Sequence, residues 1–405
     1  MNQPPRILFY SHDSFGLGHI RRTLAIGDAV AQRLEEAAVL IITGASAAHS
    51  LRIPPGVDYV KLPSVTKVGD EHYESKFLNL DFAEVRSMRE EIIFRTTLNY
   101  SPDIFFVDNV PLGLKCEIVK TLRYLREFRP HTQVILNLRD VLDCACRVVP
   151  QWEANSIYEA VEEFYDRVLV YGSPEVFDAV REYQMPDSLA RKVEYVGYIG
   201  RKTPEGAAAR IRAELVEGDE KLVLVTVGGG ADGKQIIQSY LKGLASVPDP
   251  SIETHSFIVL GPDMDEESRA DIVARYGREA RINAFSRLTI VDMCDDLTAF
   301  VEAADVVLSM GGYNTMCEVL SLRKRAVVVP RVKPRLEQWV RCTRLAKLGL
   351  IRTLHPSEAT HQRLLRDVTE SLMEESIVAP AHQVNFDGLR HVTEIVGTCC
   401  ARSVA

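Results

Sequence analysis

The feature that most constrains the fold is an alternation of short apolar runs with segments of helical periodicity, which occurs twice along the chain. Short, fully apolar runs are typical of parallel strands buried on both faces, and amphipathic segments between them supply crossover helices. In the first half, strands are expected at Arg6–Ser11, Val39–Thr43, Val57–Leu62, Asp103–Asp108, Gln133–Leu138 and Arg167–Tyr171. Helices are expected near Ile20–Leu34, Phe82–Leu98, Leu114–Glu127 and Trp152–Phe164.

The alternation weakens at Val193–Pro204 and restarts at Leu222–Val227. Further strands are expected near Ser256–Leu260, Leu288–Asp292, Val306–Met310 and Ala326–Val329. This pattern predicts an α/β protein of two Rossmann-like domains, residues 1–198 and 199–380, that face each other across a cleft. Residues 381–405 carry apolar side chains at helical spacing. We expect a helix there that crosses back onto the first domain, and the alternative is a loosely packed tail helix.

Composition narrows the function and the location. The chain has 405 residues, more than one hydrophobic core usually fills, and its 48 Lys and Arg against 56 Asp and Glu argue against a nucleic-acid-binding protein. No signal peptide and no apolar stretch of about 18 residues is visible, so we expect a cytoplasmic protein. The eight cysteines include no CxxC pair, and reduced, mostly buried thiols are expected rather than a metal site or disulfide.

In open parallel sheets, ligands bind at the carboxyl ends of the strands, where glycine-bearing turns meet helix N-termini. The first such turn, Ser11–His19, contains Gly16 and Gly18 and places His19 at the start of a helix. It lacks the G-x-G-x-x-G spacing of dinucleotide-binding turns, so NAD is disfavoured. The helix dipole disfavours a protonated His19, which suits a general base. The alternative is that this side chain only hydrogen-bonds a backbone carbonyl.

The second turn follows the strand Leu222–Val227 and begins with Gly228, Gly229 and Gly230. Such a run exposes several N–H groups that can bind a phosphate, although a plain tight turn is the alternative. It lacks the Gly-Lys-Ser/Thr ending of an ATP-hydrolysing P-loop.

The third turn follows the strand Val306–Met310 and contains Gly311 and Gly312. Asn314 and Thr315 add hydrogen-bond donors to the first turn of the next helix, and Glu318 lies on the same helix face. A carboxylate at this position can accept two hydrogen bonds from a diol such as ribose. A solvated surface glutamate is the alternative.

A fourth polar cluster contains Glu337, Gln338 and Arg341 at the start of a helix, where sugar hydroxyls could bind. The basic residues before it, Arg331, Lys333 and Arg335, could also be no more than a solvated stretch.

In this order the turns resemble the GT-B glycosyltransferases of family 28, which include the peptidoglycan N-acetylglucosaminyltransferase. The resemblance is clearest from Leu222 to Leu350, and the N-terminal half is more similar to a bacterial branch of predicted glycosyltransferases. It implies that the segment from Met293 to Leu297 lines the base pocket and that Glu318 holds the ribose. It also implies that Glu337 and Gln338 replace a Gln–Gln pair that grips the donor sugar, and that Arg341 replaces an asparagine.

This resemblance implies an inverting transfer from a nucleotide-diphosphate sugar, with UDP favoured, to a sugar, lipid-linked or small-molecule acceptor. No cofactor or metal is expected, because helix dipoles and a nearby cation can stabilise the leaving group. The base would be His19 or a carboxylate near a strand end: Asp13, Asp108 or Asp140, unless Asp140 forms a structural ion pair with Arg139. The alternatives are a nucleotide-sugar hydrolase or 2-epimerase, and a non-catalytic nucleotide-sugar-binding protein.

Two segments of the first domain, Lys61–Lys67 and Lys76–Leu80, combine basic and apolar side chains. Family members with lipid-linked acceptors often contact the membrane through this domain. Peripheral contact with the inner face of the membrane is therefore one expectation, and ordinary loops are the alternative.

Overall fold

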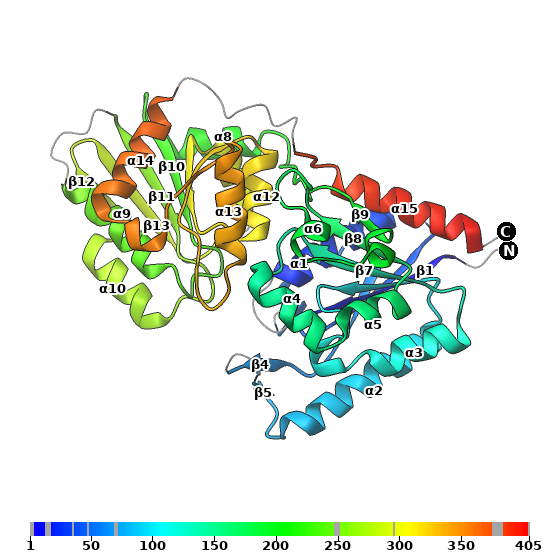
Figure 1. The fold of residues 1–405 in the computed structure, drawn as a ribbon. Helices are drawn as coiled ribbons and strands as arrows, with labels where there is room; N and C mark the ends of the chain where they lie inside the picture. The colour runs from blue at the N-terminus through cyan, green and yellow to red at the C-terminus, as the bar shows by residue number, and fades with distance from the viewer. Residues whose placement is uncertain are drawn as a thin grey trace. The chain divides into compact units, whose positions relative to one another are not determined.

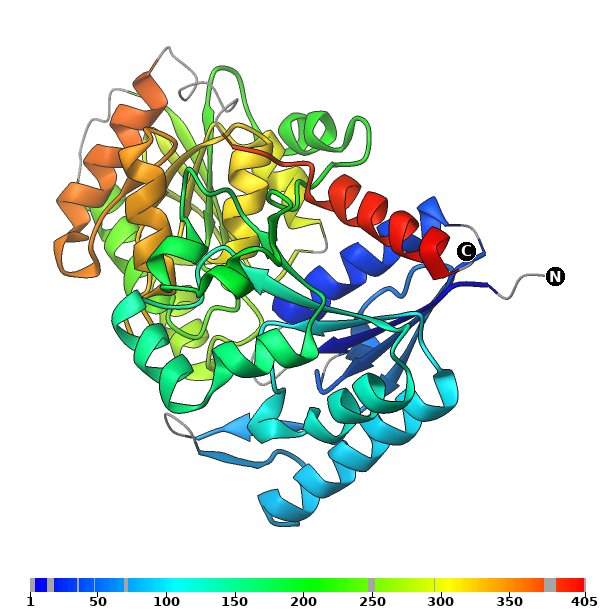
Figure 2. The same cartoon turned by 45° about the vertical axis from the view of Figure 1, so that its right-hand side comes forward.

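The computed structural model describes residues 4–12, 18–34, 36–46, 48–68, 72–246, 252–294, 296–374 and 384–403. The chain forms two compact units: Met1–Ile199 together with Asp387–Ala405, and Gly200–Phe386. The sequence pattern places these boundaries after residues 198 and 380. Each unit is built around a single large, mainly parallel sheet with helices on its faces (Figures 1 and 2).

The N-terminal unit has a seven-stranded sheet in the order β3-β2-β1-β6-β7-β8-β9, and every neighbouring pair is parallel. Its strands are β1 (Arg6–Ser11), β2 (Ala38–Thr43), β3 (Val57–Lys61), β6 (Ile104–Asp108), β7 (Gln133–Arg139), β8 (Arg167–Tyr171) and β9 (Val193–Tyr195). The central strands β1 and β6 consist of buried side chains along almost their whole length, and Phe9 stacks on Phe106 with ring centroids 4.7 Å apart.

The helices of this unit are α1 (Gly18–Arg33), α2 (Phe82–Tyr100), α3 (Val119–Phe128), α4 (Ala145–Ala154), α5 (Ile157–Phe164), α6 (Ala179–Glu182), α7 (Asp187–Ala190) and α15 (Gly388–Ser403). A capping box of Asp81 and Glu84 starts α2. The single helix expected near Trp152–Phe164 is two helices, because Ser156 adopts a left-handed conformation (φ 49°) between them. A short antiparallel hairpin of β4 (Val65–Lys67) and β5 (Tyr73–Ser75) was not predicted from the sequence.

The C-terminal unit has a second seven-stranded sheet, in the order β12-β13-β11-β10-β14-β15-β16, in which only β12 runs antiparallel to its neighbour. Its strands are β10 (Lys221–Thr226), β11 (Thr254–Val259), β12 (Glu279–Asn283), β13 (Ser286–Val291), β14 (Val306–Ser309), β15 (Arg325–Val328) and β16 (Arg352–Thr353). Its helices are α8 (Ala207–Leu215), α9 (Lys234–Ser246), α10 (Glu266–Tyr276), α11 (Leu297–Ala303), α12 (Tyr313–Ser321), α13 (Glu337–Lys347) and α14 (His361–Met373).

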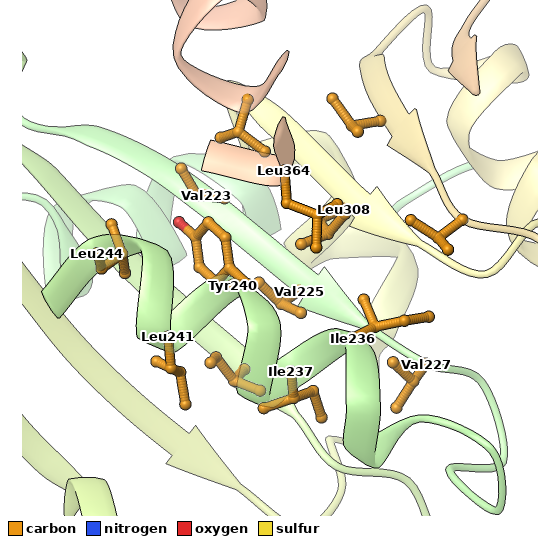
Figure 3. Close-up of a cluster of buried hydrophobic side chains, with 14 of the residues drawn as sticks. Val223, Val225, Val227, Ile236, Ile237, Tyr240, Leu241, Leu244, Leu308 and Leu364 are labelled. Carbon is orange, nitrogen blue, oxygen red and sulfur yellow. The ribbon is translucent and has the colours of Figure 1, made fainter. Parts of the chain in front are cut away.

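One hydrophobic cluster of the C-terminal unit lies between this sheet and the helices α9 and α14. Helix α9 presents Ile236, Ile237, Tyr240 and Leu241 to the side chains of β10 (Figure 3). The Tyr240 hydroxyl lies 2.9 Å from Ser256 Oγ, which satisfies the polar end of a fully buried ring.

Helix α15 belongs to the N-terminal unit, although it follows the C-terminal unit in sequence. It packs against α1, and its side chains Val392 and Val396 are fully buried. His391 Nδ1 lies 2.7 Å from the carbonyl oxygen of Val196, and Asp387 forms an antiparallel bridge with Ile199. The helix is therefore held by both apolar burial and polar contacts.

Each sheet has one position where the chain order reverses direction. In the N-terminal unit, β1 is followed by β2 and β3 on one side and has β6 on the other. In the C-terminal unit, β10 has β11 on one side and β14 on the other. The loops that leave two such strands diverge to opposite faces of the sheet and open a crevice at their carboxyl ends, which is where ligands bind in this class of fold.

Candidate functional site

At the β1/β6 reversal, a histidine and a carboxylate are in direct contact. His19 lies in the first turn of α1, and its Nδ1 is 2.5 Å from Oδ2 of Asp108, the last residue of β6. Arg22, one turn further along α1, forms an ion pair with the other oxygen of Asp108. The guanidinium of Arg22 also lies 5.9 Å from the centre of the Tyr171 ring. This leaves Nε2 of His19, whose side chain is 14% exposed, as the ring nitrogen that does not face Asp108.

Burial favours a neutral imidazole in His19, and the surrounding charges favour an ionised carboxylate in Asp108. Burial lowers the pKa of His19 below its ordinary value, and Asp108 opposes this shift without cancelling it. Burial would by itself raise the pKa of Asp108, but the charge of Arg22 and the contact with His19 outweigh burial and hold that pKa below its ordinary value. A neutral histidine oriented by a carboxylate can accept a proton at its free nitrogen.

Of the remaining catalytic candidates, the structure describes Asp140 but not Asp13. Asp13 and Gly16 fall outside the described residues, and Gly18 begins α1. Asp140 is buried, with one oxygen accepting from the backbone N–H of Val141 at 2.7 Å and the other from the Tyr198 hydroxyl at 3.1 Å. Among the candidates that the structure describes, the carboxylate in contact with His19 is that of Asp108.

At the β10/β14 reversal, the glycine turn after β10 packs against the loop after β11. A Cβ on Gly230, whose φ is 97°, would lie 2.2 Å from the carbonyl oxygen of Leu260, and one on Gly229 would lie 2.5 Å from Asp263 Oδ2. A Cβ on Gly228 would meet no atom of the described chain within 4 Å. Packing therefore accounts for Gly229 and Gly230, while Gly228 faces open space.

The turn after β14 leads directly into α12. Gly311 has a φ of 76°, and a Cβ there would lie 2.4 Å from Cys342 Sγ, whereas Gly312 faces open space in the described structure. Asn314 and Thr315 are partly exposed in the first turn of α12. Glu318, one turn further, is 5% exposed, and Arg201 Nε lies 3.6 Å from its Oε1. Glu318 is therefore a buried carboxylate next to a guanidinium, and the alternative of a solvated surface glutamate does not hold.

The polar cluster at the start of α13 is held by Arg331. Glu337 is 5% exposed; its Oε1 accepts from Arg331 at 3.0 Å, and its Oε2 has no hydrogen-bond partner among the described residues. Gln338 Oε1 accepts from the backbone N–H of Arg331 at 3.0 Å. Arg341 is fully buried, donates to the Gly311 carbonyl at 3.3 Å and lies 5.6 Å from the Tyr313 ring centre. Arg341 thus supports the turn after β14.

The segment expected to line the pocket of the nucleotide base begins with Met293, whose side chain is 62% exposed. It ends at Leu297, the first residue of α11. Met293 and Asp292 belong to the lining of a cavity of about 610 Å³ beside β12 and β13. Arg269 and Arg278 bind the two oxygens of Asp292 at 3.0 and 2.9 Å.

One expectation about the cysteines is wrong. Cys144 and Cys146 form a disulfide at the start of α4, whereas all eight cysteines were expected to be reduced. Of the other six, Cys317, Cys342 and Cys399 are buried. Within the described ranges, no group of three His, Cys, Asp or Glu side chains could hold a metal ion. No helix in those ranges is both long and apolar enough to cross a bilayer.

Comparison with known proteins finds a family match in the C-terminal half of the chain. Residues 222–390 match the C-terminal domain of glycosyltransferase family 28. A glycosyltransferase of Methanopyrus kandleri is 25% identical over 221 residues, which are 54% of this chain and 56% of that protein. The chain therefore spans about half the length of this relative.

Solved structures extend the likeness to the whole fold. MurG of Acinetobacter baumannii has a TM-score of 0.61 at 14% identity, covering 98% of this chain and 100% of its own. LpCGTa in complex with UDP has a TM-score of 0.59 at 14% identity, covering 98% and 99%. At such identities the similarity shows the fold alone. It confirms the predicted GT-B architecture, in agreement with the family 28 match of residues 222–390.

Three arginines that touch the candidate residues were not singled out for these roles from the sequence. Arg22 could have been found, because it follows His19 at the i+3 spacing that places two side chains on one helix face. Arg201 lies far along the chain from its partner Glu318. Arg331 lies six residues before Glu337, in a loop without a regular period. Their contacts with Glu318 and Glu337 depend on the fold of the whole unit.

Replacement of Asp108 by asparagine should lower the pKa of His19 further, because the carboxylate favours the imidazolium form. A histidine NMR titration would measure this, with the His19 signal assigned from its absence in His19→Asn. Asp103→Asn is the matched control, since Asp103 immediately precedes the opposite end of β6 and binds the Arg6 backbone at 2.8 Å. An unchanged or raised His19 pKa in Asp108→Asn would contradict the assigned pairing.

Proposed function

We propose that this chain is a glycosyltransferase that moves a sugar from a nucleotide-diphosphate donor, preferably a UDP-sugar, to an acceptor hydroxyl. The observation that carries the proposal is the set of groups at the β10/β14 reversal. An α-helix N-terminus, two turns with open glycine positions and a buried carboxylate on the face of α12 lie within one family 28 domain. These are the groups that a diphosphate and a ribose diol require.

In the proposed donor complex, the base lies beside Met293 and the ribose hydroxyls donate to Glu318. Arg201, whose Nε lies 3.6 Å from Oε1 of Glu318, orients this buried carboxylate. The diphosphate lies at the N-terminus of α12, where the backbone N–H groups and the helix dipole favour negative charge. The sugar lies against Glu337 and Gln338, and the unpartnered Oε2 of Glu337 accepts from one of its hydroxyls. The structure of LpCGTa in complex with UDP supports uracil as the nucleotide base.

In the proposed reaction, His19 accepts the acceptor proton at Nε2 while the acceptor oxygen bonds to the anomeric carbon. The bond from that carbon to the phosphate oxygen breaks, and its electron pair stays on the departing nucleoside diphosphate. A single displacement of this kind inverts the anomeric configuration. Asp108 orients the ring through Nδ1 and stabilises the imidazolium that forms. No step uses a metal ion.

The acceptor is a sugar, a lipid-linked sugar or a small molecule, and one surface favours a lipid-linked acceptor. Apolar side chains around the hairpin β4–β5 and the start of α2 are unusually exposed: Val68 52%, Phe77 71%, Leu78 44% and Leu80 40%. Lys76 lies among them, 5.3 Å from the Phe77 ring centre. Apolar side chains next to a cation suit insertion at the interface of an anionic bilayer.

The donor site is tested by thermal unfolding with UDP, GDP, ADP, dTDP, CDP and their common sugar conjugates. A nucleotide at about 100 times its Kd stabilises the folded state by about 2.7 kcal/mol, so one base should raise the Tm measurably. Glu318→Ala should abolish this rise, whereas Glu267→Ala, at an exposed position of α10, should keep it. No response of the wild type to any nucleotide would contradict the proposal. Donor cleavage without an acceptor would instead indicate a hydrolase or epimerase.

Membrane contact is tested by co-sedimentation with vesicles of phosphatidylglycerol and phosphatidylcholine. The double variant Phe77→Ser/Leu78→Ser should weaken binding at least about tenfold, because two apolar side chains no longer enter the interface. Phe128→Ser, which changes another exposed phenylalanine (61%) of the same unit, should bind like the wild type. Equal losses in both variants, or no binding by the wild type, would overturn membrane contact and leave the donor site unaffected.

A further inference from the structure

We infer that Arg331 is the cation that neutralises the departing nucleoside diphosphate. This inference rests on the proposed function and names a further residue of the same site. Basic residues between a strand and a helix are commonly solvated, as Lys333 and Arg335 are here. Arg331 differs from them because its guanidinium is held between two carboxylates that come from different parts of the C-terminal unit.

The position of Arg331 follows from the strand order. It stands just after β15, and its NH1 group lies 3.4 Å from Oδ2 of Asp232, in the glycine turn after β10. Strand β14 lies between β10 and β15 in the sheet. A side chain that reaches from the loop after β15 to the turn after β10 must therefore pass over the carboxyl end of β14. That end is where Gly311 and Gly312 lead into the N-terminus of α12.

The two carboxylates hold Arg331 with different strength. Glu337 is buried and accepts from NH2 at 3.0 Å, whereas the Asp232 side chain is 53% exposed and its contact is the longer one. Glu337 can therefore keep the guanidinium in place while a phosphate oxygen takes the position of Asp232. Arg331 Nε is a buried donor with no hydrogen-bond partner in the described part of the chain. A guanidinium has five N–H donors, so it can bind phosphate oxygens without releasing Glu337.

The role in the reaction is electrostatic. When the bond from the anomeric carbon to the phosphate oxygen breaks, negative charge grows on the diphosphate. Arg331 donates hydrogen bonds to these oxygens and transfers no proton, so the leaving group departs as the nucleoside diphosphate anion. Fixed donors of this kind stabilise a transition state more than a ground state, because the charge they bind grows during the reaction.

The test compares the binding of UDP, UMP and uridine by isothermal titration calorimetry. If the thermal-unfolding experiment selects another base, the diphosphate, monophosphate and nucleoside of that base are used instead. Arg331→Met should weaken UDP binding at least about tenfold and leave uridine binding unchanged, and Arg331→Lys should give an intermediate loss. Arg335→Met, in the same loop, should bind all three ligands like the wild type. Equal losses for UDP and uridine, or no loss for either, would overturn the role of Arg331 while the nucleotide site stands.

A second variant tests the inference independently, in case Arg331→Met does not fold. Asp232→Asn removes the exposed competitor for the guanidinium, so it should strengthen UDP binding about two- to fivefold without changing uridine binding. In an Arg331→Met background the same substitution should have no effect on UDP. An equal gain in both backgrounds would overturn the inference, since it would show a general charge effect. If the wild type binds neither UDP nor uridine nor any other nucleotide, the proposed function fails as well.

Discussion

Burial of both sheets on two faces is the constraint on which the arrangement of polar groups depends. The central strands β1, β6, β10 and β14 consist almost entirely of buried side chains, and such strands have no room for unpaired polar groups along their length. Polar chemistry is therefore confined to the strand ends. Because all neighbouring strands near the centre are parallel, their carboxyl ends lie on the same side of the sheet. The reversal of chain order opens a crevice at these carboxyl ends. His19 with Asp108, and the turns at Gly228 and Gly311, lie at these two reversals.

The two reversals use charge in opposite ways. In the N-terminal unit, Arg22 keeps Asp108 ionised so that the pair can orient a neutral His19, which suits proton acceptance. In the C-terminal unit, guanidinium groups lie next to the buried carboxylates of Glu318 and Glu337 and bring positive charge to the strand ends. The first arrangement suits an acceptor that must lose a proton, and the second suits a donor that carries a diphosphate.

The strands of both sheets could be predicted because full burial leaves a continuous apolar run, as in RILFYS and LVLVTV. The short strands β4, β5, β9, β12 and β16 carry no such run. Of these, β9, β12 and β16 are edge strands of the two large sheets, and the side chains of β9 and β12 are only partly buried. The helix break at Ser156 depends on one left-handed residue that no pattern marks. The pairing of His19 with Asp108 was open among three aspartates, because strand order decides which strand end lies beside β1. Arg89 and Glu117, a fully buried ion pair, were also missed, since 28 residues separate them.

Hydrogen–deuterium exchange with and without a nucleoside diphosphate tests the central claim, that the nucleotide binds at the β10/β14 reversal. We expect slower exchange of the amides in residues 226–233 and 310–319, with no matching change at the amino ends of β10 and β14. Protection in those two segments would place the phosphates and the ribose at the turns that carry Gly228 and Glu318. Protection confined to other parts of the C-terminal unit, or to the N-terminal unit, would contradict the assignment of the donor site.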